Sequence, residues 1–255
     1  MSITRRGFFG AAAGLSALAL AGKSALEIQP PQSEPDRGAP AAGTRWALVI
    51  DPRKCLDAGD CTKCLDACHK AHNVPAIAEP AHEVKWIWKA SFEHAFPSLQ
   101  TDYPPDDLRD KPVMVLCNHC DNPPCVRVCP TQATWRRDDG IVMMDWHRCI
   151  GCRYCVAACP YGSRSFNWQD PRPSLVQTNP NFPTRSKGVV EKCTLCEERL
   201  AKGEPPACVE ACPAKALVFG NLNDPASEVR SLLRARFTIR RRPELGTRPA
   251  IYYIV

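Results

Sequence analysis

Apolar residues along the chain gather in short runs, and two of these runs predict β-strands. The first covers residues 46–50 and the second covers residues 112–116, and each leads directly into a cysteine-rich stretch. Short runs of apolar, β-branched and aromatic residues are typical of buried strands. We therefore expect two strands that each deliver the chain to a set of cysteines.

A third pattern predicts a β-hairpin over residues 133–144. Two β-prone runs there flank Asp139 and Gly140. An Asp-Gly pair between such runs is a strong signal for a tight turn between antiparallel strands. Because this hairpin is short, it should bring the cysteines that precede it close to the cysteines that follow it.

The first 44 residues show a different pattern. Arg5 and Arg6 precede a weakly apolar stretch at residues 10–21, which is too short to span a bilayer by itself. An arginine pair before such a stretch is typical of a twin-arginine export signal, so we expect a signal peptide at residues 1–21. Cleavage after Ala21 and retention as an anchor both stay open. Residues 22–44 are rich in Pro, Ala, Gly, Ser and charge and predict a flexible linker, which leaves residues 45–255 as one functional domain.

Composition adds further expectations. The chain has 25 prolines and 7% aromatic residues, which indicates a loop-rich protein with little ordinary core, and its net charge is +6. Aromatic residues between 86 and 96 fit either core packing or a partner surface, and core packing is favoured: Trp86, Trp88, Phe92 and Phe96. A run of arginines between 230 and 242 predicts a solvated face, with a docking patch as the alternative, and we expect no nucleic acid partner. No later run approaches the length of a membrane helix, so we expect the mature chain to be soluble or peripheral.

Sixteen cysteines dominate the chemistry of the sequence, and they fall into four quartets. In chain order the quartets are Cys55, Cys61, Cys64 and Cys68; Cys117, Cys120, Cys125 and Cys129; Cys149, Cys152, Cys155 and Cys159; and Cys193, Cys196, Cys208 and Cys212. The third quartet has the spacing C-x2-C-x2-C-x3-C-P, which is typical of bacterial [4Fe-4S] clusters. Four quartets predict four such clusters.

Three alternatives explain the cysteines less well. Disulfide bridges are common in exported proteins, but cysteines two residues apart in sets of three are poorly placed for them. Zinc sites use paired cysteines and leave the triple spacing unexplained. Covalent haem needs C-x-x-C-H, whereas Cys64, Cys68 and His69 have one residue too many. His119, between two cysteines of the second quartet, either donates a hydrogen bond to sulfur or fills space.

In such motifs the fourth cysteine of each quartet crosses to the cluster of a partner quartet. With the second quartet paired to the third and the first paired to the fourth, this rule predicts four ligand groups. They are the Cys55 group (Cys55, Cys61, Cys64, Cys212), the Cys68 group (Cys68, Cys193, Cys196, Cys208), the Cys117 group (Cys117, Cys120, Cys125, Cys159) and the Cys149 group (Cys129, Cys149, Cys152, Cys155). The fold class is then α+β, with two ferredoxin-like units and loop-rich insertions at residues 69–111 and 161–192.

Cys55 is the least regular of these ligands. Its spacing to Cys61 is longer than usual, and Ala58 occupies the standard position. Gly59 would let the longer loop fold back so that Cys55 still binds. If Cys55 did not bind, an exposed iron would make the chain an enzyme in its own right, which is the competing hypothesis.

Several segments together resemble the four-cluster electron-transfer subunits of the dimethyl sulfoxide and polysulfide reductase families. The resemblance covers roughly residues 45–255 and is carried by residues 117–125, 149–162, 192–196, 206–213 and 220–225. Within that group, the long first quartet ending in Cys68 and His69, residues 83–88 and the arginine pair are most similar to DsrO-type subunits of DsrMKJOP complexes of sulfur metabolism.

The resemblance implies a function and a set of partners. The chain would relay electrons through four [4Fe-4S] clusters and would not itself be an enzyme. Its partners would be a quinone-interacting integral membrane subunit, a multihaem cytochrome c subunit and the other subunits of a membrane complex. It would lie in the periplasm, on the outer face of the cytoplasmic membrane. Subunits of polysulfide, tetrathionate or nitrite reductases and of hydrogenases have similar cysteine patterns and are the alternative.

Overall fold

The computed structural model describes residues 43–99, 107–108 and 111–255. The signal peptide predicted for residues 1–21 and nearly all of the linker predicted for residues 22–44 lie outside the described residues. Within the described part of the chain, no helix combines the length and the apolar character needed to cross a membrane.

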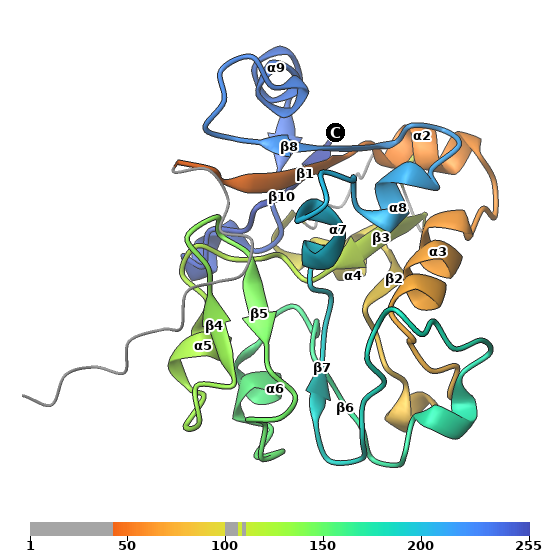
Figure 1. Cartoon of the computed structure of the whole chain (residues 1–255). Coiled ribbons are helices and arrows are strands. Elements are labelled where there is room, and N and C mark those ends of the chain that lie inside the picture. The colour runs from red at the N-terminus through yellow and green to blue at the C-terminus, as the bar shows by residue number, and fades with distance from the viewer. Residues whose placement is uncertain (1–42, 100–106, 109–110) are drawn as a thin grey trace, which may run out of the picture. The chain divides into compact units, whose positions relative to one another are not determined.

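Short helices and strands alternate along the chain, which gives a mixed α/β fold (Figure 1). The strands are β1 (Trp46–Ile50), β2 (Ile87–Ser91), β3 (Pro112–Leu116), β4 (Thr134–Arg136), β5 (Val142–Met144), β6 (Ser165–Phe166), β7 (Val190–Glu191), β8 (Leu217–Asn221), β9 (Thr238–Ile239) and β10 (Ile251–Ile254). The α-helices are α2 (Pro52–Asp57), α3 (Lys63–Ala71), α4 (Phe92–Ala95), α5 (Pro124–Arg127), α6 (Tyr154–Ala158), α7 (Glu197–Leu200), α8 (Ala207–Glu210) and α9 (Glu228–Ala235). The predicted strands at 46–50 and 112–116 are confirmed as β1 and β3.

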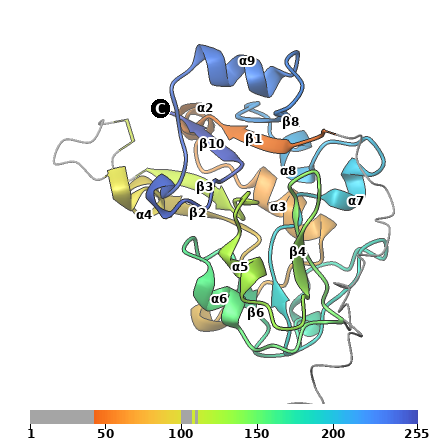
Figure 2. The ribbon, with the colours of Figure 1, turned by 90° about the vertical axis from the view of Figure 1, so that its left-hand side faces the viewer.

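The largest sheet has four strands in the order β8-β1-β10-β9. Strand β1 pairs parallel with β10 and antiparallel with β8. Since side chains alternate between the faces of a strand, Ala47 and Val49 pack with Val229 on one face, which α9 covers (Figures 1 and 2). Leu48 and Ile50 face the main core, which also contains several of the cysteines.

The predicted hairpin is confirmed by the antiparallel pairing of β4 with β5. Its turn contains Gly140, whose φ of 84° is a left-handed conformation that favours glycine. A side chain at Gly140 would also collide with the guanidinium of Arg45. The turn is therefore fixed both by its backbone conformation and by the close approach of Arg45.

The insertion at residues 69–111 contributes to the core. Strand β2 pairs antiparallel with β3, and Trp86, Phe92 and Phe96 are buried while Trp88 packs against them. The prediction of core packing for these aromatic residues is confirmed. The insertion at residues 161–192 carries β6 and β7, which pair with each other.

Three of the short helices that carry cysteines end just before a Cys-Pro pair that closes a quartet. Helices α5, α6 and α8 end one or two residues before Cys129, Cys159 and Cys212, each of which precedes a proline. Proline cannot continue a helix, because it lacks the N–H and its ring clashes with the preceding turn. Cys68 precedes His69 instead, and α3 runs on to Ala71.

These helices pack in pairs. Helix α5 packs with α6, which brings together the second and third quartets, and α3 packs with α8, which brings together the first and fourth. The assignment of two separate ferredoxin-like units to these two pairs of quartets stays a prediction.

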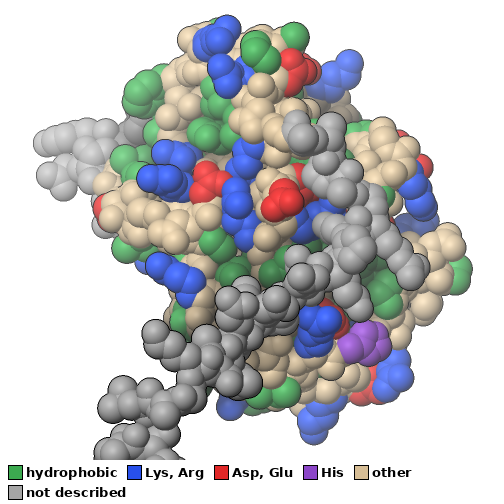
Figure 3. All heavy atoms as spheres, turned by 60° about the vertical axis from the view of Figure 1, so that its left-hand side comes forward, with side chains coloured by type: hydrophobic (Ala, Val, Ile, Leu, Met, Phe, Trp, Pro, Cys, Tyr) green, Lys and Arg blue, Asp and Glu red, His purple; other side chains and the backbone are tan. Residues whose placement is uncertain are grey.

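The arginine run at 230–242 was expected to form a solvated face, and Arg241 departs from that expectation. Arg241 is buried, with 4% exposed, whereas Arg230, Arg234 and Arg240 line an open cavity of about 460 Å³ together with Arg45 and Asp121. Lys and Arg side chains recur over the face of the molecule shown in Figure 3.

Candidate metal centres

The four cysteines of the Cys117 group face one another. They line a single small cavity, which Arg164 also lines. The pKa of Cys120 is raised to about 12, first by burial and then by the neighbouring sulfurs of Cys117, Cys125 and Cys159. Segments on both sides of the β4–β5 hairpin therefore bring these four thiols together, and their role as the ligands of one cluster stays a prediction.

The Cys55 group is also brought together, although its members come from opposite ends of the domain. Burial raises the pKa of Cys64 to about 11, and the sulfurs of Cys55, Cys212 and Cys61 add to this effect. Cys55 lies in α2, which ends before Gly59, where φ is 66°. The structure therefore places Cys55 beside the other three sulfurs, and its role as a ligand stays a prediction.

The Cys68 group is the most buried of the four. All four of its cysteines are buried. Burial raises the pKa of Cys68 well above its usual value, and Cys193, Cys208 and Cys196 act in the same direction. The packing of α3 against α8 positions Cys68 and Cys208 for this arrangement.

The Cys149 group lies beside the Cys117 group, where α5 packs with α6. Burial raises the pKa of Cys155, and the sulfurs of Cys125 and Cys149 contribute to the shift. Burial also acts to raise the pKa of Cys129, but hydrogen bonds from Thr131, Thr134 and Ala133 lower it overall. Cys129 therefore already accepts hydrogen bonds in a loop, and its membership of this group stays a prediction.

Pairwise interactions between sulfurs link neighbouring groups one after another, and this series is called the row below. The sulfur of Cys64 raises the pKa of Cys68 and of Cys208, so the Cys55 group lies next to the Cys68 group. Cys117 raises the pKa of Cys193, which joins the Cys68 group to the Cys117 group. The sulfur of Cys125 raises the pKa of Cys155, so the Cys117 group lies next to the Cys149 group. The order is Cys55 group, Cys68 group, Cys117 group, Cys149 group.

Burial differs between the middle and the ends of this row. Among the eight cysteines of the two inner groups all are buried except Cys159, which is partly exposed. Among the eight of the two outer groups, Cys64 and Cys155 are the buried ones. The ends of the row are thus closer to solvent than its middle.

The donors around the sulfurs fit an anionic cluster rather than plain thiols. Backbone N–H groups of Leu195, Ala207 and Ala216 donate to the sulfurs of Cys193, Cys196 and Cys212 at 3.3, 3.4 and 3.3 Å. Side-chain polar atoms of Asn118, His119 and Thr194, all beside cysteines, are buried with no hydrogen-bond partner among the described residues. Buried polar groups without partners are rare, and cluster sulfur would accept hydrogen bonds from the N–H and O–H donors among them.

His119 is neutral in this environment. Burial lowers its pKa well below the usual value, and the positive charges of Lys192, Arg45 and Arg164 act in the same direction. Its Nδ1 accepts a hydrogen bond from the backbone N–H of Val142 at 3.1 Å, so its hydrogen lies on Nε2. Because Nε2 is a buried donor with no partner among the described residues, the structure favours the hydrogen-bonding role for His119 over space filling.

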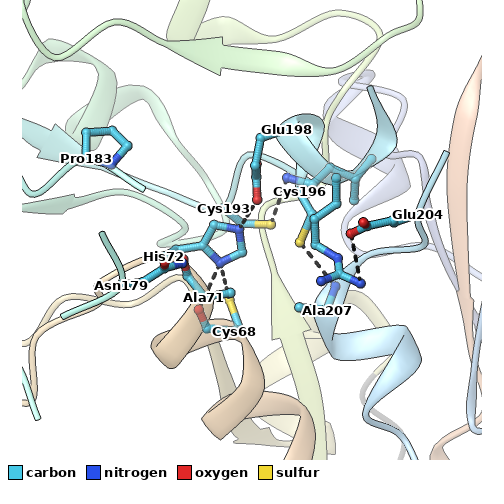
Figure 4. A network of polar contacts seen from close by, with 12 residues as sticks. Cys68, Ala71, His72, Asn179, Pro183, Cys193, Cys196, Glu198, Glu204 and Ala207 are labelled. Carbon is cyan, nitrogen blue, oxygen red and sulfur yellow. Dashed lines mark hydrogen bonds and ion pairs between the residues drawn. The ribbon is translucent and has the colours of Figure 1, made fainter. Parts of the chain in front are cut away.

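His72 is a residue beside the sulfurs that the sequence interpretation did not identify. Its ring lies between Cys68 and Glu198 (Figure 4), with Nδ1 2.8 Å from the Cys68 carbonyl oxygen and Nε2 3.0 Å from Glu198 Oε1. It also stacks on Trp86 at 4.9 Å. His72 follows Cys68 by four residues, directly after α3, a helix that no proline stops, and that spacing is the signal that could have revealed it.

His72, Cys196 and Glu198 have ligand atoms that all lie within 4.8 Å of one another. Mixed sets of this kind can hold zinc. Both ring nitrogens of His72 already face oxygen acceptors, however, and Cys196 lies with the three other sulfurs of the Cys68 group. The arrangement fits a histidine that supports the sulfur site better than a separate metal site.

Comparison with known proteins agrees with these features. Residues 113–174 and 178–222 match the 4Fe-4S dicluster domain family. The chain is 44% identical over 229 residues to the Hdr-like menaquinol oxidoreductase iron-sulfur subunit 1 of Archaeoglobus fulgidus, with 82% of each chain covered. It is 35% identical to the menaquinone reductase iron-sulfur cluster-binding subunit of Nitratidesulfovibrio vulgaris, covering 82% of this chain and 88% of that one. It is 36% identical to a subunit of the tetrathionate reductase of Salmonella typhimurium, covering 86% and 76%.

The fold and the sulfur groups define a ferredoxin-like protein with several clusters. The chain belongs to the family of 4Fe-4S iron-sulfur subunits of oxidoreductase complexes. It is an electron-transfer subunit rather than a catalytic one, and it carries [4Fe-4S] clusters; its sixteen cysteines are consistent with four of them.

Proposed function

We propose that this chain relays electrons through four [4Fe-4S] clusters between a quinone-interacting membrane subunit and a redox partner outside the cytoplasm, in a DsrMKJOP-type complex of sulfur metabolism. The observation that carries the proposal is the row of four sulfur groups, each adjacent to the next. When bound, such clusters take up and release single electrons. The cysteines would hold them, with Cys55 completing the first set and Cys129 the last.

The accessibility of the row supports its use as a relay. Electrons must enter and leave near the surface, and the outer Cys55 and Cys149 groups are the more exposed ones. Beside the Cys149 group, Ile150 and Tyr154 are 67% and 62% exposed. A redox partner could therefore approach this end closely, while the buried inner groups are shielded from solvent oxidants.

The membrane partner is supported by the relatives. Two of them are named as subunits of a menaquinol oxidoreductase and a menaquinone reductase. We infer a quinone-interacting integral membrane subunit for this chain as well, with a multihaem cytochrome c subunit as a further partner. Export by the twin-arginine route, which carries folded proteins, would place the clusters on the outer face of the cytoplasmic membrane.

A second assignment has its own support. The similarity to the tetrathionate reductase subunit extends over 86% of this chain. The chain would then serve a polysulfide, tetrathionate or nitrite reductase or a hydrogenase, with the same relay and a different terminal partner.

Co-purification from membranes separates these assignments. An affinity-tagged chain should copurify with a quinone-interacting membrane subunit and a multihaem cytochrome, and should contain about 16 iron atoms with matching acid-labile sulfide. A molybdenum-containing partner would instead support the second assignment. A colourless protein without labile sulfide would overturn both.

A further inference from the structure

The short β6–β7 ladder brings two positive charges together inside the protein. Ser165 pairs with Glu191 in this antiparallel ladder. Arg164 directly precedes β6 and Lys192 directly follows β7, so the register places them across from each other at the same end. Arg164 is 4% exposed and Lys192 is fully buried. The proximity of Arg164 contributes to lowering the pKa of Lys192, after burial itself.

Both cations lie near the sulfurs of the Cys117 group. Arg164 Nη2 donates a hydrogen bond to Cys125 Sγ at 3.1 Å, and Arg164 also interacts with Cys155. Lys192 Nζ donates to the carbonyl oxygens of Val142 and Cys193 and interacts with the sulfurs of Cys117 and Cys125. Arg164 is therefore shared with the Cys149 group and Lys192 with the Cys68 group, and the Cys117 group is common to both.

Arg241 is a third buried cation near the Cys117 group. It is 4% exposed, its Nε donates to the Ala95 carbonyl oxygen at 3.0 Å, and its guanidinium lies over the Tyr161 ring at 5.4 Å. It interacts electrostatically with Cys159. Its Nη1 is buried without a hydrogen-bond partner among the described residues.

None of these three cations forms an ion pair with a carboxylate among the described residues, whereas the equally buried Arg185 pairs with Glu191 at 2.7 Å. Burying unpaired charges is strongly unfavourable. A thiolate-ligated cluster is anionic and would supply the missing negative charge.

The other groups have fewer cations or less burial. Lys192 also interacts with Cys193 of the Cys68 group, but the negative charge of Glu198 opposes it there and raises the pKa of Cys193 and Cys196. Cys55 interacts with Lys89, which is partly exposed and so is screened by water. The Cys149 group shares Arg164 and is closer to solvent.

We propose that Arg164, Lys192 and Arg241 give the cluster of the Cys117 group the highest midpoint potential of the four. Reduction adds one negative charge, and buried cations stabilise that charge strongly because the interior screens little. Burial alone opposes reduction, but the Cys68 group is buried at least as deeply as the Cys117 group and lacks two of these cations. An electron that enters at either end of the row is then most stable on the cluster of the Cys117 group, the third in the row. This inference depends on the proposed function, since it requires four clusters.

The experiment is a redox titration with dithionite and ferricyanide, followed by paramagnetic resonance, on the full chain and on Arg164→Gln, Lys192→Met and Arg241→Gln. Each variant should lower the midpoint potential of the same signal. The expected change is at least tenfold in the oxidised-to-reduced ratio at a fixed potential, which corresponds to about 59 mV for one electron. That shared signal should be the one with the highest potential in the unaltered chain. Arg164→Gln should also shift a second signal, and Lys192→Met a different one.

Two matched variants control for charge and for folding. Arg164→Lys keeps the positive charge and should restore most of the potential. Lys202→Met removes a charge at an exposed position and should leave all four signals unchanged. If Arg164→Gln fails to fold, Arg241→Gln still tests the inference, since the sulfur with which Arg241 interacts, that of Cys159, belongs to the Cys117 group.

The outcomes separate this inference from the proposed function. About 16 iron atoms together with a shared signal that is not the highest, or with no shared signal, would overturn the inference and leave the relay intact. Absence of iron and labile sulfide would overturn the proposed function itself.

Discussion

At the scale of single residues, Cys55 is the least regular of the predicted ligands. It departs from standard spacing, yet its sulfur lies with those of Cys61, Cys64 and Cys212. We expect Cys55→Ala to reduce the iron content from about 16 to about 12 atoms per chain, with loss of one resonance signal, because a cubane with three thiolates is labile. Ala58→Ser, at the standard ligand position, should retain all the iron. Four unchanged signals in Cys55→Ala would show that Cys55 is not a ligand.

Tyr253 gives a pH dependence whose sign can be worked out. Its hydroxyl donates to the Met114 carbonyl oxygen at 3.1 Å, and burial raises its pKa. The unfolded chain then loses this proton first, so the contribution of Tyr253 to stability is complete below about pH 10 and is lost as pH rises further.

We expect Tyr253→Phe to lower the free energy of unfolding by about 1 kcal/mol at pH 8, because the hydrogen bond is lost. The difference from the unaltered chain should shrink above about pH 10. Urea unfolding followed by circular dichroism between these pH values measures both effects. Tyr252→Phe, which keeps its ring under Arg240, is the control and should match the unaltered chain. A difference that stays constant with pH would contradict the expectation.

At the scale of elements, a buried ion pair within the insertion at residues 161–192 binds the other insertion through hydrogen bonds. Arg185 and Glu191 pair at 2.7 Å with no exposure, and Trp86 Nε1 donates to the same carboxylate at 2.9 Å. Arg185 also donates to the carbonyl oxygens of His72 and Asn73 at 2.5 and 2.6 Å. One guanidinium thus holds residues 161–192 against the segment that follows α3.

Arg185→Ala should lower the free energy of unfolding by about 3–5 kcal/mol, because it leaves Glu191 buried without its partner. Thermal unfolding of the cluster-loaded protein measures the loss. Arg172→Ala removes an exposed arginine that pairs with Asp170 at 2.6 Å and should leave stability unchanged. Equal effects of the two substitutions would refute this role for Arg185.

The elements also show what the sequence could and could not predict. Strands β1 and β3 and the β4–β5 hairpin were predictable because each depends on a local run or turn. The parallel pairing of β1 with β10 was not, since it joins residues about two hundred positions apart. Cysteine spacing carries a ligand signature, whereas Arg164 and Lys192 are single charges whose proximity arises from a two-residue ladder.

At the scale of the whole molecule, the clusters would take the place of a conventional core. Cysteines belong to the main apolar cluster and to a second one, so the sulfur groups are built into the packing. The Cys55 group, for example, brings together residues from α2, from α3 and from the segment after α8. Separating these segments would expose much of the interior.

Removal of iron should therefore unfold the chain. We expect an anaerobic iron chelator to remove the cluster absorbance and the far-ultraviolet circular dichroism together, because the energy of metal binding is also folding energy and the freed thiols would crowd unpaired in the interior. Limited proteolysis should then cut within residues 45–255, which the loaded protein protects. The same chelator at low temperature for a time too short to remove iron is the control. A stripped chain that kept its dichroism and its resistance to protease would show that β1, β8 and β10 with α9 suffice to hold the fold.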